Sequence, residues 1–241
     1  MRAELKKVRS LPTPMWCLIA VLVCFLIGVG ATIIWGPGED AAAIDGAISL
    51  PTLVAAIVFG VWIVGVEYGQ NTLRRTLTAD PRRVRLIVAK LASMLLVVVL
   101  VTVMLHLVAL PLFDLAAQGH DQSIRAEDVK DIALAALLNN VAYAIVGFAF
   151  GLITASMAGG ITMTLVFVFV IDSLISIVPK VGNLAMGPAL EKISSSLRGI
   201  DTGLFGDEIG TAHTSDVMIV AAWLVGLVVL GSLRFVRSDV K

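Results

Sequence analysis

Six long apolar stretches decide what this sequence can fold into. They cover residues 16–35, 50–66, 91–112, 132–153, 161–178 and 217–233. Each comes close to the roughly 20 residues that a helix needs to cross a bilayer. Backbone polar groups inside a bilayer must be satisfied within the chain, so such stretches form helices. With 58% hydrophobic and 15% charged residues, the chain is too apolar for a soluble domain. The sequence predicts an all-α membrane protein, one transmembrane domain over residues 1–241 with six spans.

A basic segment over residues 67–90, between the second and third stretches, sets the predicted orientation. It reads EYGQNTLRRTLTADPRRVRLIVAK and holds six of the eighteen Lys and Arg residues. Basic segments next to a span stay on the cytoplasmic side. With this loop inside, thirteen of the eighteen basic residues lie on the inner side and five on the outer side. Both termini are therefore predicted to be cytoplasmic.

The residues before the first span form a short basic and amphipathic segment. Residues 1–14 are predicted to be an interfacial helix that lies on the inner surface against anionic lipid headgroups. The alternative is a cleaved signal peptide, which the length of the following apolar run argues against. Residues 36–49, between the first two spans, are interpreted as a short outer connector.

The basic segment itself shows helical and turn signals. A carboxylate at the edge of a span is costly unless paired, so Glu67 is expected to form an ion pair with one of the cations that follow it. Asn71 and Thr72 suit a helix N-cap, and Leu73 and Leu77 share one helical face. The Asp80–Pro81 pair then predicts a turn, with the third span starting near Arg82. The alternative is a solvated polybasic loop that contacts anionic lipid.

Four polar residues inside the predicted spans are candidates for a substrate path: His106, Asn139, Asn140 and Asp172. An ionisable group within a span is a functional candidate by default. The structural alternative for Asp172 is a hydrogen bond to a neighbouring helix, for instance to His106 or Asn139.

Small residues and loop patterns predict how the later spans pack. Gly147 and Gly151 lie four residues apart, a spacing that lets helices approach closely. Residues 156–160 are interpreted as a tight inner turn. Residues 179–215 are the longest outer segment, in which apolar residues at helical spacing from Leu190 to Ile200 predict an amphipathic helix, interfacial or re-entrant.

Several enzyme signatures are absent from the sequence. It has no Gly-rich loop ending in Lys-Ser or Lys-Thr, no HExxH and no Gly-x-Ser-x-Gly. The histidines His106, His120 and His213 fall in one span and two outer loops, which suits no shared metal. We therefore expect no catalytic residues, no metal, no bound cofactor and no nucleic-acid partner for this chain.

The inner loop resembles that of the permease subunit of ABC-2 type exporters. The residues that carry the resemblance are Glu67, Tyr68, Thr72, Leu73, Arg74, Pro81, Arg82 and Lys90. The family usually has glycine where this chain has Asn71, and asparagine is the residue type that most readily replaces glycine at unusual backbone angles. The motif covers about a tenth of the chain. Over the rest of the chain, the resemblance lies in the pattern of predicted spans.

This resemblance implies a cytoplasmic coupling helix within residues 67–90 that contacts a separate ATPase subunit. The residues implied in ATPase coupling are Glu67, Tyr68, Asn71, Thr72, Leu73, Arg74, Arg75, Leu77, Pro81 and Arg82. It also implies two ATPase copies that carry ATP and Mg, and a second permease chain, identical or different. The location would be the bacterial plasma membrane, with multiple passes. Apolar spans with few fixed charges favour a hydrophobic or amphipathic cargo, such as a drug, lipid or peptide.

Two other functions remain open from the sequence. The first is an ion-coupled secondary transporter or channel that uses Asp172 and His106. The second is a membrane scaffold or an intramembrane enzyme.

Overall fold

The apolar segments form long helices in the computed structural model of the protein. The structure describes residues 41–69, 83–118, 126–198 and 210–237, together with six isolated helical positions between residues 19 and 30. These residues are helical, with short turns and no strand among them. By length and composition, five of the described helical segments can cross a membrane, as expected of a multi-pass membrane protein.

The described helices account for the second to sixth predicted spans. The long helices are α3 (Ala41–Gly69), α5 (Arg83–Gln118), α6 (Ala126–Thr154) and α10 (Thr214–Arg237). Between α6 and α10 the chain forms α7 (Met157–Val166), the π-helical segment η1 (Phe167–Ile171), α8 (Asp172–Ile177), the 3-10 turn η2 (Gly182–Leu184) and α9 (Met186–Arg198). The predicted interfacial helix and most of the first predicted span lie outside the described residues. A helix does form within residues 179–215, as its apolar spacing predicted.

Several helices extend beyond the apolar stretches that predicted them. α3 begins at Ala41, inside residues 36–49, so the prediction of a connector there was wrong from residue 41 onward. α5 continues to Gln118 and α6 begins at Ala126, in segments too polar to count as spans. Apolarity marks how much of a helix lies in lipid, whereas alanine-rich flanks continue the helix by intrinsic propensity.

The turn between α6 and α7 is shorter than the predicted 156–160. Ala155 adopts a left-handed backbone with φ 53°, and its N–H donates to Gly151 O at 3.1 Å, which closes α6. Ser156 then caps α7, since its hydroxyl accepts a hydrogen bond from Gly159 N at 3.3 Å. Residues 157–160 are thus the first turn of a helix rather than a loop.

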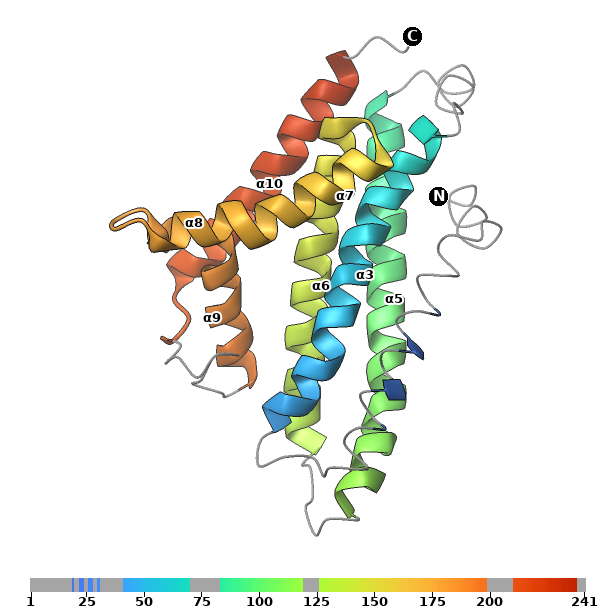
Figure 1. Ribbon diagram of the computed structural model, residues 1–241, viewed down its shortest axis with the longest axis vertical. Helices are drawn as coiled ribbons and strands as arrows, with labels where there is room; N and C mark the ends of the chain where they lie inside the picture. The colour runs from blue at the N-terminus through green and yellow to red at the C-terminus, as the bar shows by residue number, and fades with distance from the viewer. Residues whose placement is uncertain are drawn as a thin grey trace.

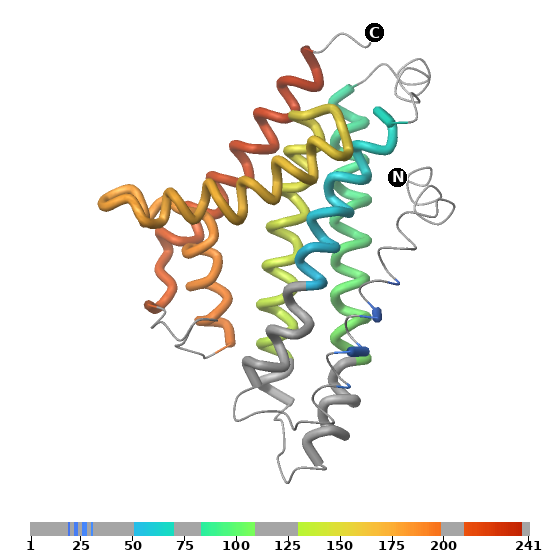
Figure 2. Tube along the Cα trace, viewed as in Figure 1, coloured from blue at the N-terminus to red at the C-terminus, as the bar shows by residue number. Residues whose placement is uncertain are grey.

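Helix α6 lies in the middle of the described bundle. Figures 1 and 2 show it between α3 and α5 on one side and α9 and α10 on the other. Phe148 and Ala144 face a cluster shared with α3 and α5, whereas Val146 and Phe150 face one shared with α9, α10 and η1. Because α6 is buried on two sides, its sequence is apolar around most of its circumference.

Glycines allow α3 and α6 to pack with their backbones close together. A Cβ added to Gly147 would lie 2.6 Å from Ile57 O, and one added to Gly151 would lie 3.3 Å from Val61 O. On α3, a Cβ on Gly60 would overlap the backbone carbonyl of Ala144. Gly147 and Gly151, which the sequence analysis assigned to helix packing, therefore lie directly against α3.

Candidate functional site

The ends of α3, α5 and α10 that flank the predicted coupling loop gather at one end of the bundle (Figure 1). We call this region the inner end, after the orientation predicted from the sequence, and define it as residues 63–69, 83–90, 154–160 and 231–237. Glu67, Tyr68 and Lys90 belong to it. The other residues implied in ATPase coupling lie outside the described residues: Asn71, Thr72, Leu73, Arg74, Arg75, Leu77, Pro81 and Arg82.

A buried ion pair joins the two helices that carry this loop. Lys90 Nζ on α5 lies 3.1 Å from Glu67 Oε1 on α3, and the two side chains are only 4% and 2% exposed. Lys90 Nζ also donates to Ile63 O at 2.7 Å, one turn earlier on α3. The structure confirms that Glu67 pairs with a cation of the basic segment and identifies Lys90 as that cation. A buried charge pair with a further hydrogen bond holds its two helices in one geometry.

A second set of contacts joins α5 and α3 to the end of α10. Arg83 Nη1 donates to Phe235 O at 3.1 Å and to Val236 O at 3.0 Å. The last carbonyls of a helix lack intrahelical donors, so Arg83 caps α10 from the first residue of α5. The ring of Tyr68 meets Phe235 edge to face, with centroids 6.4 Å apart. The end of α3 and the start of α5, which flank the loop, therefore both contact α10.

The surface of the inner end is positively charged. Arg85, Arg234 and Arg237 are exposed. Among the described residues of this end, Glu67 is the only acid, and it is buried and paired with Lys90. The described part of this surface therefore attracts an acidic partner surface or anionic lipid headgroups.

Two of the four candidate path residues come together inside the bundle. His106 Nδ1 lies 2.7 Å from Thr102 O on the same helix, and Asn140 Nδ2 on α6 donates to Thr102 Oγ1 at 3.1 Å. His106, Thr102 and Asn140 are all buried. They form a polar contact between α5 and α6, which we call the Thr102 cluster. Asn139, the next residue on α6, is half-buried.

The fourth candidate, Asp172, has different partners. Its Oδ1 accepts a hydrogen bond from Met186 N at 2.7 Å, and its Oδ2 accepts one from Gly187 N at 2.7 Å. The carboxylate therefore binds the first N–H groups of α9, where the helix dipole also favours a negative charge. Neither His106 nor Asn139, the partners suggested by the sequence, makes these contacts.

We expect Asp172→Ala to destabilise the junction between α8 and α9. It would leave one buried and one partly buried N–H donor without their acceptor, which costs about 1–3 kcal/mol in total stability. Hydrogen exchange of the first turn of α9 should rise in this variant. Ser173→Ala, at the exposed neighbouring position, is the matched control and should leave exchange unchanged. Equal protection of α9 in the two variants would contradict the capping role.

Sequence reasoning missed three partners at these sites. Thr102 lies four residues before His106 and so on the same helical face, a signal that was present in the sequence. The contacts of Arg83 with α10 and of Asp172 with α9 join elements whose packing no local pattern encodes.

Comparison of the sequence with models of known protein families and with curated protein sequences gave no match.

Proposed function

We propose that the protein is the membrane-spanning permease subunit of an ATP-driven exporter. The observation that carries this proposal is the construction of the inner end. Residues 70–82 connect α3 to α5. Next to this connection, the Glu67–Lys90 pair joins α3 to α5, and Arg83 joins the start of α5 to the end of α10. A force applied to that loop from the cytosol would therefore act on three spans at once. The resemblance of the loop to ABC-2 type permeases supports the same function.

The motor in this proposal is a separate cytoplasmic ATPase, present in two copies, which supplies ATP and Mg. ATP binding brings the two ATPase copies together, and the coupling loops transmit that movement to the spans. The bundle then changes from an inward-open to an outward-open state because the closed ATPase pair binds the second state more tightly. A second permease chain completes the path across the bacterial plasma membrane. The cargo is a hydrophobic or amphipathic molecule.

The alternative is an ion-coupled carrier that uses Asp172 and His106. The buried Thr102 cluster favours it, because polar groups inside a membrane often mark ion paths. Asp172 and His106, however, contact different elements, so a proton relay between them would need an intermediate group. Proton-driven uptake or release by the purified chain alone would support this alternative.

The export function predicts that loss of positive charge in the loop abolishes ATPase association. We expect Arg74→Glu with Arg75→Glu to reduce copurification of a coexpressed partner ATPase by at least about tenfold, because two attractive charges become repulsive. Chromatographic behaviour in detergent should stay that of the unmodified protein.

The matched control is Arg125→Glu with Lys130→Glu, which changes the same charge on the predicted outer side. This control should copurify with the ATPase normally. Normal complex yield from the Arg74 and Arg75 double variant would argue against coupling through this loop, and equal loss in both double variants would point to a general charge effect.

A further inference from the structure

The fifth predicted span does not run along the bundle. α7, η1 and α8 form one helical run over residues 157–177, which Figure 1 shows crossing the direction of α3, α5 and α6. Its far end, α8, lies beside the bundle at a level between the two ends of α6. The chain then turns through residues 178–185, and α9 continues along α6 and α10. The structure therefore has a break in helical backbone beside the bundle, at a level between the two ends of α6.

Backbone of this kind is tolerated at membrane depth only where protein covers it or water reaches it. Residues 178–181 are exposed in the chain, and they include Lys180, whose backbone has φ 71°. A lysine and irregular backbone facing lipid tails would both be costly. The turn is exposed in the single chain, so water, a polar ligand or the second permease chain proposed above would have to cover it.

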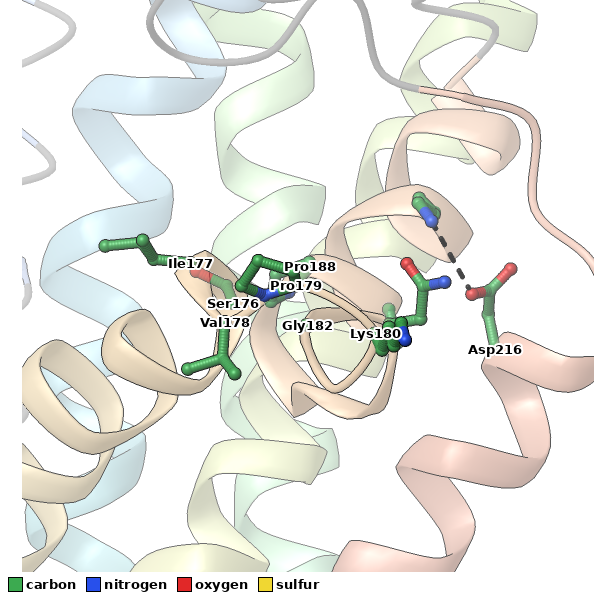
Figure 3. A pocket seen from close by; sticks show the side chains of 11 residues that line it. Ser176, Ile177, Val178, Pro179, Lys180, Gly182, Pro188 and Asp216 are labelled. Carbon is green, nitrogen blue, oxygen red and sulfur yellow. Dashed lines mark ion pairs between the residues drawn. The ribbon is translucent and has the colours of Figure 1, made fainter.

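A pocket of about 290 Å³ lies against this turn. Its apolar wall comes from the end of α8, the turn and the first turn of α9: Ile177, Val178, Pro179, Pro188 and Ala189. Its polar wall includes Lys180, Asn183, Lys192 and Asp216. Figure 3 shows Asp216 on the opposite side of the pocket from Ser176 and Val178. The volume suits a headgroup or a small organic acid rather than a whole lipid.

The charge of the pocket favours an anion. Lys192 Nζ lies 3.9 Å from Asp216 Oδ1, a loose ion pair that leaves the lysine side chain 35% exposed. Asp216 Oδ2 already accepts a hydrogen bond from His213 N at 2.8 Å, which caps α10. With Lys180, the pocket lining contains two cations and one acid that already caps α10, so the net charge of the lining is positive.

The walls of the pocket are held in place before any ligand arrives. Trp223 Nε1 on α10 donates to Leu184 O in η2 at 2.8 Å, which fixes the turn to α10. Asp172 binds the first N–H groups of α9 and fixes the other wall. Binding of a ligand would therefore cost little conformational entropy in the site.

We propose that this pocket binds the anionic head, phosphate or carboxylate, of an amphiphile whose apolar part lies over the exposed face of α8. Leu174 and Ile177 on that face are 60% and 76% exposed. This inference rests on the proposed export function and names the class of its cargo. Lys180 and Lys192 provide the charge, and α8 provides the apolar contact.

The test is binding to the purified full-length chain in dodecyl maltoside, measured by titration calorimetry with a micelle-only blank. The probes are dihexanoyl phosphatidic acid, dihexanoyl phosphatidylcholine and inorganic phosphate. We expect phosphatidic acid to bind at least about tenfold more tightly than the other two, because only it combines a net negative head with an apolar part. Equal binding of inorganic phosphate would overturn the amphiphile, and equal binding of phosphatidylcholine would overturn the preference for an anion.

Two independent variants assign that binding to the pocket. Lys180→Asn removes the charge and keeps a residue that tolerates positive φ, and Lys192→Gln removes the second charge within a helix. Each should weaken phosphatidic acid binding by about tenfold. Lys130→Gln, an exposed lysine on α6 away from the pocket, should leave binding unchanged. Unchanged binding in both pocket variants would overturn the site.

This experiment separates the inference from the proposed function because it uses no ATPase. Binding that depends on Lys180 and Lys192, together with no ATPase association, would leave the site and remove the export function. ATPase association without such binding would overturn the pocket alone.

Discussion

Gly60→Ala is expected to break the packing of α3 against α6. The added Cβ would overlap the carbonyl of Ala144, a backbone atom that cannot rotate away. α6 would have to move from α3, and the close contact between Gly147 and Ile57 on the same interface would open with it. Overpacking a tight site costs 1–3 kcal/mol or more, and backbone against backbone belongs at the upper end, at about 3 kcal/mol.

The effect is measured as the loss of helical circular dichroism on heating in detergent. Gly226→Ala is the matched control, because a Cβ on this α10 glycine meets nothing within 4 Å. Alanine favours a helix over glycine by about 1 kcal/mol, so this control should melt at the same temperature as the unmodified protein or slightly higher. Equal melting of the two variants would show that α3 and α6 are not in close contact.

Removing either partner of the Glu67–Lys90 pair is expected to destabilise the protein strongly. Both Glu67→Gln and Lys90→Met leave one buried charge without its counterpart. Breaking a buried pair from one side typically costs about 3–5 kcal/mol. Lys130→Met, at an exposed lysine on α6, serves as the control and should change stability by less than about 0.5 kcal/mol.

The double variant Glu67→Gln with Lys90→Met should recover much of this loss, because it removes both buried charges together. A double-mutant cycle on denaturation midpoints measures the recovery as a coupling energy. Additive losses would mean that the two side chains do not interact. If the double variant is stable and still loses ATPase-driven export, the pair also transmits movement from the loop to the spans.

The helical and apolar character of the described segments could be predicted from the sequence. Apolar stretches 17 to 22 residues long have few alternatives to a helix in lipid, and the five described helical segments that are long and apolar enough to cross a membrane coincide with predicted stretches. The limits of the helices were less certain, as α3 and α5 show, because alanine-rich and polar flanks extend a helix without any change in hydropathy.

The candidate site could be predicted only in part. Glu67 at the end of an apolar run needed a cation, and the sequence placed six cations after it. Identifying Lys90 as the cation that pairs with Glu67 required the tertiary packing of α3 against α5, which brings the two side chains together. Asp172 likewise needed a partner, but its partner is the backbone of α9, and backbone N–H groups look the same at every position of a sequence.

By itself, the sequence determined that the described part of this chain is helical, where its long apolar helices lie and that Glu67 is paired, because apolarity and the cost of an unpaired charge act on local composition. Only the tertiary structure decided that α7 and α8 cross the bundle, that Arg83 caps α10 and that Lys180 and Lys192 share a pocket with Asp216. These features depend on crossing angles between helices, which follow from how glycines and side chains of distant segments fit together.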